Sequence, residues 1–313
     1  GFGMNRALFY AMTVAGCSQI LAAFTQDWIA LAILQMLAGS AAGIALPSIY
    51  GLATTVAPKG KEAQTLSRVT LGWSLSLVAA VPLAAFLADA FSWRITLVVF
   101  GSLHIIMLIP LSIFRFAPTP SQTKFSLLTP FTLKGSFSIY AINFLFMGCF
   151  YGIYAFSGAH AVTGFGQSTA NAGLIALIYG FGFGAASFLA GPLDRLPPNA
   201  TMPCSLLFAT AIICCISIAP NYQAFLIAFA IWGVINHLIL NLILTRIGDL
   251  SATHKGATLA MYSGITYIAS MVAIFGIGSL IETRGYIQLV LLAAGFQFCA
   301  FVIALVFKKP ARA

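Results

Sequence analysis

Apolar runs of about 20 residues, separated by short polar segments, make up most of this chain. A helix needs about 20 consecutive apolar residues to cross a bilayer, so each run predicts one membrane span. A helix also satisfies its backbone hydrogen bonds internally, as a lipid environment requires. We therefore expect an all-α polytopic membrane protein with helices at residues 7–24, 28–52, 66–90, 94–114, 136–158, 168–190, 200–219, 222–246, 257–281 and 285–307.

The composition supports this class. Hydrophobic residues make up 60% of the 313 residues and charged residues only 7%, with a mean hydropathy of +0.99, whereas soluble domains carry about 25% charged residues. The net charge of +9 is spread over the chain, so it does not indicate nucleic-acid binding. The cysteines lie within apolar runs without metal-ligand spacing, and we find no nucleotide-binding loop or nucleophile–base pair. We expect no metal, no cofactor and no enzymatic activity.

Basic residues are concentrated on alternate loops, as the preference of cytoplasmic loops for Lys and Arg predicts. Arg94 and Arg284 alone lie on the opposite side. We therefore expect both termini to be cytoplasmic in a bacterial inner (plasma) membrane. The basic, Pro- and Ser-containing segment 116–135 is interpreted as a cytoplasmic linker between helix bundles at 1–115 and 136–313. The basic residues on the cytoplasmic side are Arg6, Lys59, Lys61, Arg68, Arg115, Lys124, Lys134, Arg195, Arg246, Lys255, Lys308, Lys309 and Arg312.

A weak internal repeat relates the two parts of the chain. A shift of 194 residues aligns Trp28 with Tyr222, and a shift of 193 aligns Asp89 with Glu282 and Trp93 with Tyr286. Each half then has about 193 residues, and the first would begin before Gly1. We expect ten of twelve helices to be present, in two six-helix halves with a substrate site between them, which is a known transporter plan.

Three short stretches resemble motifs of the major facilitator superfamily. The family's loop signature, Gly-x-Leu-x-Asp-Arg, resembles "GPLDRL" at Gly191, Leu193, Asp194 and Arg195, although Asp194 follows Leu193 directly here. The tail of a first copy resembles "GFGMNR", at Gly3 and Arg6. The stretch "VPLAAFLADAFSWR" is similar to the helix 5 and 6 motif, at Pro82, Trp93 and Arg94. The resemblance implies the family's two-bundle fold and a transport function.

The resemblance also implies a gating role for the loop. Asp194 could lie against the positive N-terminus of a neighbouring helix and be released as the halves move; the alternative is an ordinary solvated turn. The helix 4 equivalent departs from the family pattern, because Gln35 stands four residues before Gly39 where an Arg is usual. The helix 5 equivalent has Val81-Pro82 where the antiporter signature has Gly-Pro.

Residues of run 136–158 form an aromatic face with a single amide, at three- and four-residue spacing. The helix 7 equivalent lines the cavity in this family, so the face is a candidate for substrate contact; packing or lipid-facing aromatics are the alternative. Gln35 and Trp73 are weaker candidates. The residues of the face are Tyr140, Asn143, Phe146, Phe150 and Tyr154.

Polar residues within run 222–246 form the second candidate group. Asn236, His237 and Asn241 are costly in lipid and should face the protein interior. His237 could titrate near neutral pH, or these side chains could serve only as hydrogen-bonding links between helices. No Asp, Glu, Lys or Arg lies in the middle of any run, so a coupling carboxylate would have to lie in the helices before Gly1.

We therefore expect a secondary transporter that exports a neutral or amphipathic small molecule by alternating access, driven by protons. Its partners are the lipid bilayer, the small-molecule substrate and the proton, and we expect a monomer. The lack of fixed charge in the runs disfavours a strongly ionic substrate, because a buried charge needs partners. A proton-coupled uptake symporter and a truncated, non-transporting remnant are the alternatives.

Overall fold

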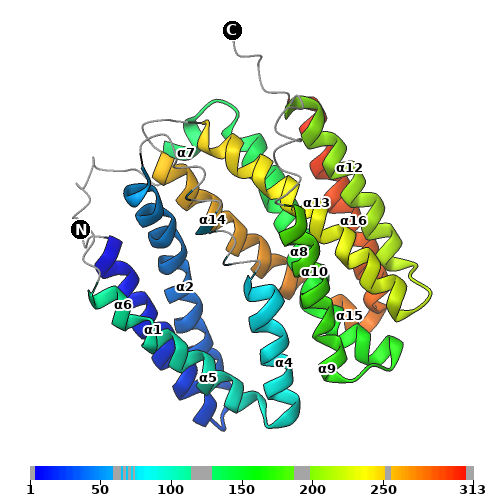
Figure 1. Cartoon of the computed structure of the whole chain (residues 1–313). Helices are drawn as coiled ribbons and strands as arrows, with labels where there is room; N and C mark the ends of the chain where they lie inside the picture. Colours follow the sequence, from blue (N-terminus) through cyan, green and yellow to red (C-terminus); the bar gives the residue numbers. More distant parts are fainter. Residues whose placement is uncertain are drawn as a thin grey trace. The chain divides into compact units, whose positions relative to one another are not determined.

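The computed structural model describes residues 4–58, 65, 68, 69, 72, 75–113, 129–186, 198–250 and 255–307. Every regular element in these ranges is a helix (Figure 1). Eight of the described helical segments are long and apolar enough to cross a membrane, and two shorter apolar ones cover Val78–Ala90 and Thr169–Ala185. The chain is thus an all-α integral membrane protein. The eight spans are Met4–Phe24, Trp28–Ala53, Trp93–Ile113, Ser136–Phe165, Ala200–Ser217, Tyr222–Gly248, Ala257–Ile281 and Tyr286–Val306.

The chain forms two units, and the first comprises residues 1–73 and 83–124. Helix α1 (Met4–Phe24) packs against both α2 (Trp28–Val56) and α5 (Trp93–Ile106), which continues into α6 (Leu108–Ile113) (Figure 1). A Cβ added at Gly16 would lie 2.9 Å from the carbonyl oxygen of Gly101, and one at Gly101 would lie 2.9 Å from that of Gly16. The close approach of α1 and α5 therefore depends on a glycine from each helix.

The second unit comprises residues 74–82 and 125–313. Its centre is α8 (Ser136–Phe165), which packs against α14 (Lys255–Val272) and α16 (Tyr286–Val306). Gly166, with φ +65°, ends α8 in the left-handed conformation that suits glycine. Three further helices complete the packing: α10 lies on α13, and α12 lies on α13 and α16. Their bounds are α10 (Leu174–Ala185), α12 (Pro198–Ser217) and α13 (Tyr222–Gly248).

Short elements connect or extend these helices. The π-helix η1 (Ser76–Ala80) leads into α4 (Val81–Ala90), and η3 (Ala273–Ile277) joins α14 to α15 (Gly278–Arg284). These two π-helices lie in the runs 66–90 and 257–281, which the internal repeat pairs with one another. The remaining short helices are α7 (Thr129–Thr132) and α9 (Thr169–Ala172).

The starts of α2 and α13 support the internal repeat. Asp27 Oδ2 accepts a hydrogen bond of 2.9 Å from the Ala30 amide, and Asn221 Oδ1 accepts one of 2.9 Å from the Ala224 amide. Both side chains cap the first turn of their helix. Asp27 and Asn221 are 194 residues apart, which is the shift that aligns the two helices in sequence.

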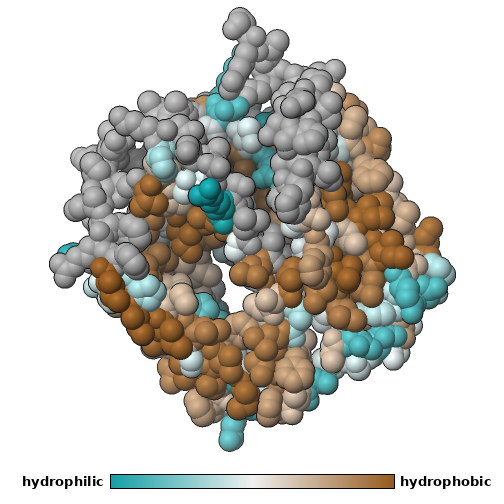
Figure 2. Space-filling model, viewed as in Figure 1, coloured by the Kyte–Doolittle hydropathy of each residue, from teal (hydrophilic) through white to brown (hydrophobic). Residues whose placement is uncertain are grey.

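Large apolar side chains are widely exposed, as expected for a lipid-facing surface. Phe137, Ile218 and Phe275 each expose more than three quarters of their surface, and Figure 2 shows hydrophobic residues, in brown, over much of the described surface. A soluble protein rarely exposes large contiguous apolar patches.

Candidate functional site

The aromatic face of α8 lies largely inside the second unit. Tyr140, Asn143, Phe146 and Phe150 each expose 4% or less of their surface, and Tyr154 is half-buried. The Tyr140 hydroxyl donates to the carbonyl oxygen of Thr258 at 3.2 Å. The regular spacing therefore identified a face of α8 that turns toward the protein.

Asn143 links α8 to α14 from within the same face. Its side-chain amide donates to Thr266 Oγ1 at 3.2 Å and to the carbonyl oxygen of Tyr262 at 3.4 Å. Its Oδ1 is buried and has no hydrogen-bond partner. The amide thus uses its donors for helix–helix contact and leaves its acceptor unused.

Toward the other end of the face, four aromatic side chains from three helices form what we call the aromatic cluster: Phe150 and Tyr154 of α8, Tyr179 of α10 and Trp232 of α13. The Phe150 ring lies 5.2 Å from Tyr154, 5.4 Å from Tyr179 and 5.7 Å from Trp232, between ring centroids. Tyr179 and Trp232 each expose only 1% of their surface. Such contacts between offset or tilted rings fix the rotamers of the side chains.

The polar residues of α13 meet this cluster. Asn236, with 1% exposure, donates from its amide nitrogen to the Tyr179 hydroxyl at 3.0 Å. His237, with 8% exposure, places its ring edge-on against Phe183 at 4.7 Å between centroids. Asn241, one turn further along, is exposed. Asn236 and His237 thus face the protein interior, as expected for polar groups in a membrane span.

Glycines let α10 and α13 approach closely enough for these contacts. A Cβ at Gly182 would collide with the Ala230 carbonyl, and one at Gly233 would collide with the Tyr179 carbonyl and lie 2.9 Å from the Phe183 amide nitrogen. No pattern in the sequence marked Gly182, Gly233, Tyr179 or Trp232 as part of a site. A single tyrosine within the apolar run 168–190 was the only available signal for Tyr179.

Candidates in the first unit are less enclosed. Gln35 and Arg6 are exposed, on α2 and α1. Pro82, the second residue of α4, is half-buried and belongs to the second unit. Arg94 donates to the carbonyl oxygen of Thr25 at 3.0 Å, and its guanidinium lies 4.4 Å from the Trp93 ring. The Trp93-Arg94 pair thus joins the start of α5 to the end of α1.

Several sequence predictions lie outside the described residues and stay predictions. Within the described part of the chain, no three His, Cys, Asp or Glu side chains are arranged to hold a metal ion. The predicted site residues that lie outside the described part of the chain are Gly3, Trp73, Gly191, Leu193, Asp194 and Arg195.

Comparison with known proteins identifies the family. The model of the Major Facilitator Superfamily matches residues 2–163 and 137–313. The chain belongs to this superfamily. It is 26% identical over 295 residues to YwfA of Bacillus subtilis (strain 168), an uncharacterized MFS-type transporter, covering 91% of this chain and 72% of the relative. It is 29% identical over 260 residues to a "Probable sugar efflux transporter" of Mannheimia succiniciproducens, covering 79% of this chain and 63% of the relative.

Solved structures agree in fold at low sequence identity. The fucose:proton symporter FucP of E. coli aligns with a TM-score of 0.70 at 13% identity, over 98% of this chain and 83% of that one. The human organic anion transporter MFSD10 aligns with a TM-score of 0.74 at 12% identity, over 96% and 77%. The family is one of secondary transporters in membranes, and not of enzymes.

Proposed function

We propose that this protein exports a neutral or amphipathic small molecule by alternating access, in exchange for protons. The positions of the charged residues support this substrate class. Within the eight described spans, the charged residues are Arg6, Arg94 and Arg246, and each lies within three residues of a span end. A strongly ionic substrate would need a buried counter-charge, so a neutral solute fits these helices better.

A sugar-like or nucleoside-like solute suits the polar groups that the spans do contain. Amides, hydroxyls and aromatic rings bind hydroxylated rings without a fixed charge. The relative from Mannheimia succiniciproducens is named as a sugar efflux transporter, which supports both the substrate class and the direction. Uptake by proton symport is the second candidate, because FucP, which shares the fold, is a proton symporter.

Transport in proteoliposomes tests direction and coupling together. Purified protein would be reconstituted and supplied with a labelled panel of monosaccharides, disaccharides and nucleosides under an imposed pH gradient. Proton antiport predicts uphill accumulation when the lumen is acidic, and symport predicts it when the outside is acidic. A folded protein that moves no solute in either gradient, and shows no exchange of solute, would support the non-transporting alternative.

Cytoplasmic termini, an inner-membrane location and a monomeric state belong to the same proposal. The bias of basic residues toward one set of loops supports the orientation. Reporter fusions at each terminus that are active only in the cytoplasm would test the orientation.

A further inference from the structure

Three buried polar atoms on α8 and α13 have no hydrogen-bond partner. They are the Tyr154 hydroxyl, Asn236 Oδ1 and His237 Nδ1. An unsatisfied buried polar atom costs about 1–3 kcal/mol, and proteins keep few of them unless ordered water or a ligand completes the bonding. Three such atoms from two helices, one in the aromatic cluster and two beside it, therefore indicate a site that binds something small and polar.

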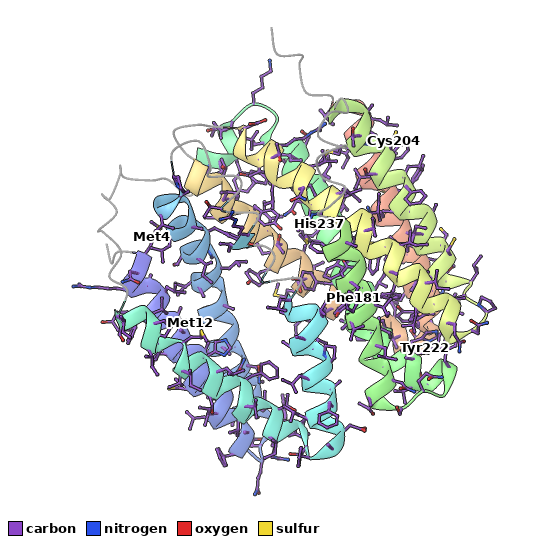
Figure 3. All side chains as sticks on the ribbon, in the orientation of Figure 1. Met4, Met12, Phe181, Cys204, Tyr222 and His237 are labelled. Carbon is purple, nitrogen blue, oxygen red and sulfur yellow. The ribbon has the colours of Figure 1, made fainter. Side chains whose placement is uncertain are left out.

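Tyr179 contacts two of the three residues. Its hydroxyl accepts the hydrogen bond from Asn236 at 3.0 Å, and its ring lies 5.7 Å from that of Tyr154. His237 follows Asn236 in the chain, and its ring lies 4.7 Å from that of Phe183, one turn along α10, which lies 6.1 Å from Tyr179. Tyr154 and Asn236 thus lie against Tyr179, and His237 lies against Phe183 on the same helix. Figure 3 shows His237 well along α13 from Tyr222, the first residue of that helix.

The unpartnered groups suit water better than a larger ligand. The rings of Phe150, Tyr179 and Trp232 pack against one another and expose 1–3% of their surface, so none of these three has a free face to stack on a sugar. A buried water makes about three hydrogen bonds to otherwise unsatisfied groups. Asn236 Oδ1 accepts from such a water, and the Tyr154 hydroxyl can accept or donate.

His237 is the group at this site whose side chain can carry an added proton, as an imidazolium. On α8 the titratable side chains are Tyr140, Cys149, Tyr151, Tyr154 and His160, and on α10 Tyr179. On α14 they are Lys255, Tyr262 and Tyr267, and on α12 the exposed Cys204, Cys214 and Cys215. None of these is a carboxylate; the amine, Lys255, is the first residue of α14, and the His160 ring stacks on that of Tyr286 at 4.3 Å between centroids. Arg246 lies nine residues further along α13, near its end.

We propose that Tyr154, Asn236 and His237 hold ordered water that delivers the coupling proton to His237, with Tyr179 as the positioning residue. This rests on the proposed proton-driven transport. A water bound at Asn236 Oδ1 transfers a proton to the neutral imidazole at Nδ1 and receives one from the next water, so one proton moves and only O–H and N–H bonds change. Tyr179 acts through Asn236, whose amide it keeps oriented.

The test separates proton coupling from solute exchange. In proteoliposomes, solute counterflow needs no proton movement, whereas accumulation under a pH gradient does. We expect His237→Gln to lower gradient-driven accumulation by at least about tenfold, in the range of ordinary coupling free energies, while counterflow stays near the wild-type rate. His237→Gln that still accumulates solute like the wild type would overturn the proposal.

Tyr179→Phe tests the positioning role without removing the histidine. It should move the pH profile of accumulation to lower pH by about half to one unit. The Asn236 amide is no longer held in place, so the His237 imidazolium is less well stabilised. The matched control is Tyr286→Phe, which also removes a buried tyrosine hydroxyl. That hydroxyl donates to the carbonyl oxygen of Ile153 at 3.4 Å. Equal pH profiles for the two variants would contradict the role of Tyr179.

The outcomes distinguish this proposal from the function on which it rests. If the wild-type protein shows neither counterflow nor accumulation with any solute, the transport proposal fails. If the wild type transports and neither His237→Gln nor Tyr179→Phe changes the coupling, only the water site fails. Should His237→Gln not fold, the comparison of Tyr179→Phe with Tyr286→Phe still decides.

Discussion

Replacing Gly233 by Ala tests the close contact of α10 and α13 most directly. The added Cβ would collide with the Tyr179 carbonyl and lie 2.9 Å from the Phe183 amide nitrogen, whereas ordinary contacts are 3.4–4 Å. Both groups belong to the backbone of α10, so no side chain can move aside. The helices would have to separate by about half an ångström or more, which is the kind of overpacking that costs about 1–3 kcal/mol.

The internal repeat supplies the matched control. Gly39 of α2 aligns with Gly233 under the shift of 194, and a Cβ there would meet no atom within 4 Å. Gly39→Ala should therefore leave stability unchanged or raise it by up to about 1 kcal/mol, because Ala is the better helix former. A propensity gain of about 1 kcal/mol applies at Gly233 as well, so the expected net loss there is about 0–2 kcal/mol, and Gly233→Ala should be about 1–3 kcal/mol less stable than Gly39→Ala.

Thermal unfolding in detergent, followed by tryptophan fluorescence, measures both variants. Trp232 reports on this contact because it lies one residue before Gly233 and is buried. The separation should also stretch the 3.0 Å hydrogen bond from Asn236 to Tyr179 beyond about 3.5 Å, the limit for a useful bond. If Gly233→Ala melts at the same temperature as Gly39→Ala, the described approach of the two helices is refuted.

The remaining predictions concern helix contacts and caps. Asn221→Ala should lower the free energy of unfolding by about 1 kcal/mol in chemical denaturation, because the first turn of α13 loses its cap, while Asn221→Asp should retain it. Asn143→Leu should cost only about 0.5–1.5 kcal/mol in the same assay, since it removes two hydrogen bonds to α14 together with an unpartnered acceptor. Arg94→Ala should lower the melting temperature more than Arg94→Lys, since a lysine can still reach the Thr25 carbonyl; equal losses would argue against that hydrogen bond.

Hydropathy was enough to predict the membrane helices, because the bilayer fixes their length and composition. The run 285–307 became α16, Tyr286–Val306, and the run 222–246 became α13, Tyr222–Gly248. The length of α8 was underestimated, because residues up to Phe165 continue the helix to a left-handed Gly166. Polar residues such as His160 and Thr163 interrupt the apolar run there, so hydropathy alone does not reveal the last turns of this helix.

The packing partners could not be predicted in the same way. Helix α8 is apolar on all sides, so its periodicity could identify an aromatic face but not the helix against which it packs. The contact of Asn143 with Thr266 joins residues 123 positions apart, and the Asn236–Tyr179 contact joins residues 57 apart. Gly182 and Gly233 approach backbones on a different helix, so no spacing within either helix marks them.

The repeat separates the features that the two related helices α2 and α13 share from those found in one of them. Helices α2 and α13 share a capped start and a similar length, and both end without a glycine cap. Their polar content differs: the positions in α2 that align with Asn236, His237 and Asn241 hold Ala42, Gly43 and Pro47. A polar group within a span is costly and is retained where it has a role. Of these two related helices, α13 alone therefore carries the candidate coupling residues.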